Sequence, residues 1–363
     1  MKKINRIVVK VGTKVLTSKD RSLDKERVKD LAWQIADIRD KGIDVLLVTS
    51  GAIGAGMWLL GMKKRPSGLS ELQAAAAIGQ NHLMQLYSEY FRARGYVAGQ
   101  ILLTQEDFND RKRYLNIKHT IGALLKHKAI PVINENDTVA TDEIRCGDND
   151  RLSSLVADIC RADGLILLTD VDGLLDEDGS VIAGVADVNH RIMKLGGKSR
   201  CDLGTGGMAT KLMSAKAVAK AGIECVIANG TAKNILRRIV LDSERLGTTI
   251  HSADTKLGAR KRWIAYSARA KGVIRVDDGA RAALSRNDRS LLASGIVGAD
   301  GRFVPGDVVG IVDRAGVEFA RGISGFSVED VRKIKGLKSA DFKGILGHKG
   351  RDEVVHKDNL VIL

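Results

Sequence analysis

The feature that most constrains the fold is a repeated alternation of short apolar runs and helix-like segments over the first 255 residues. Runs rich in β-branched residues recur at Ile7–Val11, Ile43–Val48, Val97–Leu103, Ile130–Ile133, Leu165–Leu168 and Ile223–Ala228. Continuous apolar strands separated by helices predict a mostly parallel sheet that is covered by helices on both faces. We therefore expect an α/β fold, and sheets of this kind bind ligands at the carboxyl ends of their strands.

The clearest helical segment is Leu23–Lys41. Val28 and Leu31 belong to an apolar face with helical spacing. Asp24 stands where an N-cap is expected, and Gly42 stands where the helix should end.

The pattern changes after about residue 255. Seven basic residues and no acid lie between Lys256 and Arg275. Short strands then follow at Val273–Val276, Val308–Val312 and Glu318–Gly322, separated by turns rich in Asp, Gly and Pro. We expect a first domain over residues 1–255, a basic linker over 256–271 and a small, mainly β domain over 272–363.

Composition excludes several classes of protein. No apolar run approaches the roughly 20 residues that a membrane-spanning helix needs. The N-terminus, MKKINRIVVKVG, has no signal-peptide pattern, so we expect a cytoplasmic protein. The four cysteines form no C-x-x-C pair, which argues against zinc or disulfides. The net charge of +14 suits either nucleic acid or an anionic substrate such as ATP, and does not decide between them.

The first polar motif is Lys10, followed by Gly12 and Thr13. A lysine near the end of a strand places an ammonium beside a turn whose backbone N–H groups can face a phosphate. A solvent-exposed lysine before an ordinary turn is the alternative, which the segment alone favours.

The second motif is Val48–Gly56, which contains Ser50 and Gly51 and follows the apolar strand Ile43–Val48. Glycines at the start of a helix let the backbone approach an anion closely. The spacing matches neither the dinucleotide fingerprint nor the common phosphate-binding loop, and a loop that needs tight turns is the alternative.

The third motif is an acidic and amide-rich segment directly after the strand Ile130–Ile133. Residues 134–150 hold six acids and one base, and include Asn134, Asp137, Asp148, Asn149 and Asp150. Carboxylates suit the ammonium of an amino acid, amides suit both of its ends, and Mg²⁺ would find ligands nearby. We favour an amino-acid site here over a solvated acidic loop.

The fourth motif is the glycine-rich stretch Gly204–Lys211, which leads into a helix predicted over Leu212–Ala221. A glycine stretch that enters a helix N-terminus favours an anion, and Lys211 there opposes the helix dipole unless it has an anionic partner. Thr169 and Asp170, at the end of another strand, form a neighbouring polar pair.

Together these motifs contain what phosphoryl transfer needs, because in that reaction the protein positions the reactants and stabilises charge. A carboxylate acceptor is already ionised at neutral pH and needs no general base. None of the seven histidines falls in the four motifs, so the sequence favours a kinase that acts on a carboxylate of a small amino acid.

The segments VVKVGT, LVTSGAIGAG, PVINENDTVAT, GDNDRLS, LLTDVDGLL and LGTGGMATK, in this order, closely resemble the amino-acid kinase family, in particular its members that phosphorylate glutamate. The stretch from GVIRVDDGARAAL to FVPGDVVGI resembles the PUA domain, a small β domain of RNA-binding type that many such members carry. The resemblance covers nearly the whole chain.

This resemblance implies a three-layer αβα sandwich, the cofactors ATP and Mg²⁺, and the product L-glutamyl 5-phosphate, formed in the first step of proline synthesis. By position it assigns catalysis to Lys10, Lys211 and Asp150, with Asp150 orienting the two lysines. It assigns L-glutamate binding to Ser50, Gly51, Asn134, Asp137, Asp148 and Asn149. It assigns ATP binding to Lys10, Thr169, Asp170, Thr205, Gly206, Gly207, Met208, Ala209, Thr210 and Lys211.

Two positions depart from the family pattern. Lys14 puts an extra cation beside the phosphate turn, and Leu175 stands where an aromatic residue is common. The implied partners are other copies of the chain, a downstream glutamyl phosphate reductase and RNA at the PUA-like domain, with no membrane contact.

Two alternatives remain at this stage. Relatives that act on acetylglutamate, aspartate, carbamate or UMP share the expected fold, although the segments around Asp137 and Asp150 and the β tail favour free glutamate. An RNA-binding or RNA-modifying protein would use the basic linker, but Trp263 and Tyr266 are its only aromatic residues, and single-strand binders usually supply stacking platforms.

Overall fold

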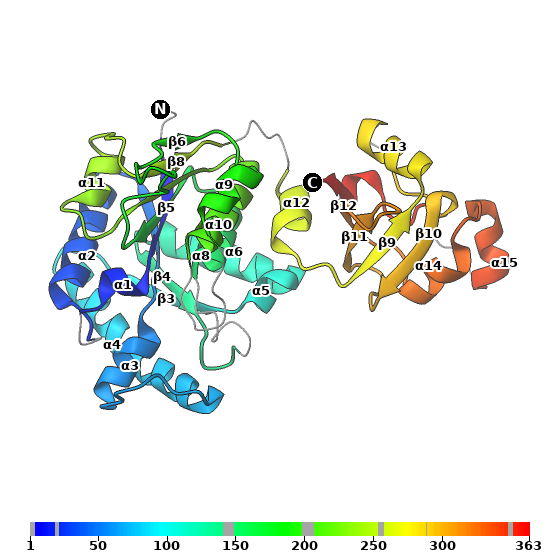
Figure 1. Cartoon of the computed structure of the whole chain (residues 1–363). Helices are drawn as coiled ribbons and strands as arrows, with labels where there is room; N and C mark the ends of the chain where they lie inside the picture. Colours follow the sequence, from blue (N-terminus) through cyan, green and yellow to red (C-terminus); the bar gives the residue numbers. More distant parts are fainter. Residues whose placement is uncertain are drawn as a thin grey trace. The chain divides into compact units, whose positions relative to one another are not determined.

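The computed structural model describes residues 4–18, 22–140, 149–197, 207–252, 258–287, 289–347 and 351–363. The chain forms two compact units (Figure 1). The first comprises Met1–Asp107 and Arg111–Thr255, and the second comprises Phe108–Asp110 and Lys256–Leu363. Among the described residues, no helix is both long and apolar enough to cross a membrane.

The described part of the first unit contains an eight-stranded sheet with the order β3-β4-β2-β1-β5-β7-β8-β6. Its strands are β1 (Arg6–Val11), β2 (Asp44–Val48), β3 (Ala98–Leu103), β4 (Ile130–Glu135), β5 (Gly164–Thr169), β6 (Gly184–Val185), β7 (Glu224–Asn229) and β8 (Thr248–Ile250). Every neighbouring pair is parallel except β7 and β8. The predicted mostly parallel sheet is confirmed, and its six predicted strands are all present. The pattern does not predict β6 and β8, which are only two and three residues long.

Strand β1 lies at the centre, with β2 on one side and β5 on the other. Ile7 pairs with Val45 of β2 and with Gly164 of β5. The strands that follow β1 in the sequence, β2 to β4, all lie on one side of it, and β5 is the first strand on the other side. The order therefore reverses at β1, and ligands of open α/β sheets bind at the carboxyl end of such a switch point.

Helices cover both faces of this sheet, as expected for three layers. The described helices of this part of the chain are α1 (Thr13–Leu16), α2 (Lys25–Asp40), α3 (Ala52–Leu59), α4 (Leu69–Arg92), α5 (Gln105–Asn109), α6 (Arg111–Lys126), α8 (Asn149–Ile159), α9 (His190–Leu195), α10 (Met208–Lys220) and α11 (Ile235–Val240). Figure 1 shows α2 and α11 on one side of the strands and α8 and α10 on the other.

The side chains of β1 point alternately to the two faces of the sheet, and each face is covered by its own layer of helices. Ile7, Val9 and Val11 pack in one buried cluster with residues of α2, α4 and α11. Because successive strand residues point to opposite faces, Lys10 faces the other layer, where α8 packs against β1. Because side chains alternate along the strand, Lys10 lies on the face of the sheet that α8 covers.

The capping signals of α2 act as predicted. The carboxylate of Asp24 accepts a hydrogen bond of 3.0 Å from the backbone N–H of Arg27. Gly42, after the helix, has a φ of +80°, a conformation that favours glycine. The helix begins and ends within two residues of the predicted bounds.

The second unit is built on a five-stranded sheet with the order β10-β9-β11-β12-β13 among the described residues. Its elements are α12 (Ala259–Arg262), β9 (Gly272–Val276), α13 (Asp278–Asn287), β10 (Ile296–Gly301), β11 (Val308–Val312), β12 (Glu318–Ile323), α14 (Val328–Ile334), α15 (Phe342–Leu346) and β13 (Leu360–Ile362). The three predicted strands are present. The pattern misses β10 because its sequence, IVGADG, is rich in glycine and acid, and misses β13 because it is short.

Candidate active site

Two lysines and one aspartate from three distant segments meet in the interior of the first unit. Asp150 Oδ1 lies 2.5 Å from Lys10 Nζ, and Asp150 Oδ2 lies 3.0 Å from Lys211 Nζ. The Asp150 side chain is fully buried, and the two lysine side chains are 4% and 7% exposed. The three residues proposed for catalysis are therefore in direct contact.

Each member of this cluster is placed by its own element. Lys10 comes from β1, Asp150 is the second residue of α8, and Lys211 lies in the first turn of α10. A carboxylate at a helix N-terminus is stabilised by the helix dipole, which adds to the attraction of both ammonium groups for Asp150. The hydroxyl of Thr210 lies 3.1 Å from Asp150 Oδ2 and 2.8 Å from the carbonyl oxygen of Gly207.

Two positive charges meet at one carboxylate in this cluster. Both ammonium groups are buried, and both contact Asp150. A buried charge is costly unless it is paired. An anion that reaches the lysines would therefore bind favourably, and a phosphoryl group has the required charge and oxygen acceptors.

Amides join the ends of β2 and β4 next to this cluster. Asn149 Nδ2 lies 2.5 Å from the carbonyl oxygen of Thr49, 2.7 Å from Asn134 Oδ1 and 3.1 Å from Ser50 Oγ. Because Asn149 directly precedes Asp150, one segment of chain anchors both the lysine cluster and the amide network. Three of the residues predicted to bind substrate are thus brought together.

Two residues of α4 support this network and are missed by the sequence motifs. Gln80 Oε1 accepts a 2.7 Å hydrogen bond from Asn134 Nδ2, and the hydroxyl of Tyr87 lies 3.1 Å from Thr49 Oγ1. Gln80 is buried, four residues after the buried Ala76. A glutamine within the apolar face of a helix is the signal that could have drawn attention to it.

Asp137 follows β4 and is half-buried. Burial raises the pKa of its carboxyl to about 6, against the opposing effect of the positive charge of Arg65. Arg65 belongs to the connection between α3 and α4. The segment after β4 therefore holds a carboxyl group whose pKa lies close to neutral.

Gly51 and Gly56 lie in the same segment, but glycine is needed at each position for a different physical reason. Gly51 adopts a φ of +99° at the start of α3, a conformation that side chains rarely adopt. A Cβ atom on Gly56 would lie 1.7 Å from the carbonyl oxygen of Ala75, so this glycine permits close packing of α3 on α4. Helix packing therefore accounts for Gly56, a role that differs from the expected approach to an anion.

The residues predicted for ATP lie around the ends of β5 and α10. Thr169 is buried at the end of β5, and its Oγ1 donates to Asp170 Oδ1 at 3.2 Å. Helix α10 begins at Met208, which Ala209 follows, and its N-cap, Gly207, supplies no capping side chain. The backbone N–H groups of this first turn are suited to an anion. Asp148, Thr205 and Gly206 lie outside the described residues, so their predicted roles stay predictions.

The acidic side chains of the site suit a magnesium ion that is held mainly by phosphates and water. The oxygens of Asp150 contact the two lysines, and those of Asp170 contact Thr169 and Lys14. In the described ranges, no group of three or more His, Cys, Asp and Glu side chains is arranged to hold a metal ion. Mg²⁺ bound with a nucleotide keeps several waters and needs only one or two protein ligands, so this donor set fits it.

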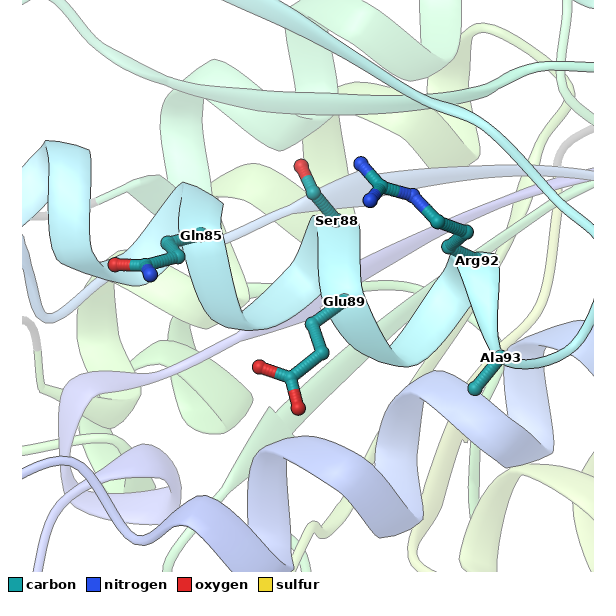
Figure 2. Close-up of a pocket in the computed structure, with 5 residues that line it drawn as sticks. All are labelled: Gln85, Ser88, Glu89, Arg92 and Ala93. Carbon is teal, nitrogen blue, oxygen red and sulfur yellow. The ribbon is translucent and has the colours of Figure 1, made fainter.

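A separate pocket lies on the outer side of α4. It is lined by four residues of this helix, Gln85, Ser88, Glu89 and Arg92, and by its C-cap residue, Ala93 (Figure 2). None of these residues belongs to the lysine cluster or to the amide network. This pocket is therefore distinct from the cluster of polar side chains at the ends of the strands.

Two family models and relatives of nearly the same length match this chain. Residues 5–229 match the model of the amino acid kinase family, and residues 272–346 match that of the PUA domain. A glutamate 5-kinase of Caldanaerobacter subterraneus subsp. tengcongensis is 48% identical over 364 residues, which cover 99% of this chain and 98% of the relative. A glutamate 5-kinase of Citrifermentans bemidjiense is 44% identical over 369 residues, with 100% and 99% coverage. A solved UMP kinase of Bacillus anthracis is 16% identical with a TM-score of 0.47, covering 70% of this chain and 98% of that one.

A mostly parallel sheet that matches the amino acid kinase model, joined to a PUA domain, defines the class of protein as an amino acid kinase with an appended β domain. The chain belongs to the amino acid kinase family and, within it, to the group of the glutamate 5-kinases. The expected family and the expected C-terminal domain are confirmed.

Proposed function

We propose that this chain transfers the γ-phosphoryl group of ATP to the side-chain carboxylate of L-glutamate and forms L-glutamyl 5-phosphate, the first step of proline biosynthesis. The observation that carries the proposal is the buried contact of Asp150 with Lys10 and Lys211. Two ammonium groups held at one point suit a transferring phosphoryl group, whose charge must be stabilised for reaction. The names of the full-length relatives support glutamate as the acceptor.

In this mechanism the two lysines neutralise charge on the phosphoryl group from opposite sides. Asp150 contacts each lysine with a different oxygen and so fixes the distance between the two ammonium groups. The glutamate carboxylate attacks in line with the departing ADP oxygen, and it is already ionised at neutral pH. The protein therefore needs no general base and contributes positioning and electrostatic stabilisation.

We assign the substrate to the region between β2 and β4. Ser50, Asn134 and Asn149 would hold the polar ends of glutamate, since their side chains already form one hydrogen-bonded network. Asp137 would pair with the ammonium group of the substrate. Gly51 and Asp148 are proposed for the same site.

We assign ATP to the carboxyl end of β5 and the N-terminus of α10. The polar side chains there are Thr169, Asp170, Thr210 and Lys211, and the backbone of Gly207, Met208 and Ala209 would face phosphate oxygens. Thr205 and Gly206 are proposed for the same stretch. Mg²⁺, held mainly by the phosphates of ATP and by water, would supply further neutralisation of charge.

The domain bounds and cellular context are also proposals. We propose residues 1–255 as the kinase domain, 256–271 as the linker and 272–363 as the PUA-like domain. The division of the compact units at Thr255 and Lys256 and the PUA match over residues 272–346 support the two domains, whereas residues 256–271 fall within the second compact unit. We further propose a cytoplasmic homo-oligomer that passes its reactive acyl phosphate to a glutamyl phosphate reductase. RNA contact by the PUA-like domain remains a prediction.

The test is ADP release with Mg·ATP and each of five acceptors, namely L-glutamate, N-acetylglutamate, L-aspartate, carbamate and UMP. Hydroxylamine traps an acyl phosphate as a hydroxamate. We expect ADP release and hydroxamate only with glutamate, and turnover with another acceptor alone would refute the assigned substrate.

Lys211→Ala tests the assigned chemistry, with Lys220→Ala as the matched control. Lys220 is the exposed last residue of the same helix. We expect Lys211→Ala to lower kcat far more than it raises the KM for glutamate, and Lys220→Ala to behave as wild type. A pure KM effect would mean that Lys211 contributes uniform binding.

A further inference from the structure

A second lysine–aspartate pair lies at the edge of the proposed nucleotide site. Lys14 Nζ is 2.8 Å from Asp170 Oδ2. In contrast to the buried cluster, the Lys14 side chain is 67% exposed and that of Asp170 is 40% exposed. The pair is thus open to solvent and to an incoming ligand.

The sheet brings these two residues together. Val11 pairs with Leu168 at the ends of β1 and β5, and the backbone N–H of Gly12 donates to the carbonyl oxygen of Leu168 at 3.1 Å. The turn after β1 is therefore tied to the end of β5. Lys14, on α1, spans the short distance that remains to Asp170, the first residue after β5.

Both oxygens of Asp170 are held. Lys14 contacts Oδ2, and Thr169 Oγ1 donates to Oδ1 at 3.2 Å. Partial burial is the largest single influence and raises the pKa of Asp170. The hydrogen bond and the charge of Lys14, a backbone hydrogen bond and the hydrogen bond of Thr169 together outweigh it and hold the pKa below its usual value. Asp170 is therefore a fixed negative charge where the phosphates of ATP are expected, and Lys14 offsets it.

Folding stability does not account for this arrangement. An ion pair between two exposed side chains contributes little to stability because water screens it. An ammonium group has three N–H donors, and the contact with Asp170 uses one of them. The other two point to a role in ligand binding.

We propose that Lys14 sets the affinity of this chain for the β- and γ-phosphates of ATP, with Asp170 as the residue that positions it. The inference rests on the proposed nucleotide site. Lys14 cancels the repulsion between Asp170 and the phosphates and donates hydrogen bonds to phosphate oxygens. It is a binding residue, since its ammonium group pairs with Asp170 and not with the buried Asp150.

The experiment compares Lys14→Gln, Lys14→Arg and the control Lys41→Gln in the full-length chain. Lys41 is an exposed lysine after α2, at the opposite end of the strands. Calorimetric titration gives the Kd for ATP and for AMP, which lacks the two outer phosphates, and steady-state assays give kcat and KM. Thermal unfolding checks that each variant is folded.

We expect Lys14→Gln to raise the Kd and KM for ATP about five- to tenfold, as for the loss of one partly exposed charged hydrogen bond. The Kd for AMP and kcat should stay within about twofold, which corresponds to less than 0.5 kcal/mol. Lys14→Arg should recover most of the ATP affinity because it keeps the charge, and Lys41→Gln should match wild type.

Equal weakening of ATP and AMP, or a fall in kcat with unchanged ATP affinity, would overturn the proposal. Unchanged ATP affinity in Lys14→Gln would overturn it as well. If the wild type binds ATP but does not turn over glutamate, the proposed function fails, while the titrations still decide the role of Lys14. A wild type that does not bind ATP would overturn both.

Discussion

The substitution Asp150→Asn tests the buried cluster most directly. It keeps the shape of the side chain and removes its charge, so two buried ammonium groups lose their shared counterion. Removal of one partner from a buried ion pair costs about 3–5 kcal/mol. Because Asp150 is fully buried and serves two lysines, we expect a loss toward the upper end of this range.

This loss should be visible as a lower melting temperature. A destabilisation of 1 kcal/mol lowers the Tm of a unit of this size by about 2–4 °C, so we expect a fall of roughly 8–20 °C. Turnover should fall about 100-fold or more, because the lysines lose the orientation that serves the transition state.

Two further measurements separate charge from packing. In the double variant Asp150→Asn with Lys211→Met, one buried ammonium is removed together with its counterion, so the combined loss should be smaller than the sum of the single losses by about 1–3 kcal/mol. Pyrophosphate should raise the Tm of Asp150→Asn more than that of the wild type, because in the folded variant it binds the two lysines that have lost the charge of Asp150.

The reasoning would be refuted by an Asp150→Asn variant that melts within about 2 °C of wild type, a shift of less than 1 kcal/mol. Strict additivity in the double variant would also show that the two residues are not coupled through charge.

The remaining predictions concern the substrate region and the helices that support it. Gln80→Leu should raise the KM for glutamate about fivefold with little change in kcat, because Asn134 loses one hydrogen-bond partner. Burial raises the pKa of Asp137 to about 6, so kcat/KM for glutamate should fall roughly tenfold per pH unit below about pH 6. In Asp137→Asn this acidic decline of kcat/KM should be absent. Gly56→Ala should lower stability by about 3 kcal/mol or more in thermal unfolding, because the added Cβ would overlap a carbonyl oxygen of α4. Gly122→Ala, where a Cβ meets no atom within 4 Å, should instead gain about 0.5–1 kcal/mol.

Local sequence was sufficient for most of the elements of the first unit. The apolar runs mark six strands, and Asp24 and Gly42 mark the ends of α2, because these signals act within a few residues. Short strands such as β8 and β13 escape this reasoning, since three residues carry too little periodicity. Their position depends on the neighbouring strands that complete their hydrogen bonds.

The sequence by itself determined which chemical groups were available to the site. Lysines at strand and helix ends, glycines before helices and an acidic segment after β4 pointed to phosphoryl transfer before any contact was known. Residue types and their place relative to strand ends suffice for this, because parallel strands present their carboxyl ends at one edge.

Only the tertiary structure decided which of these groups touch. Lys10 meets Asp150 because β1 alternates and α8 covers the face to which Lys10 points. Gln80 reaches Asn134 across 54 positions, and Lys14 reaches Asp170 across 156. Strand order and helix packing fix these contacts, and both depend on residues far apart in the chain, so no local pattern can specify them.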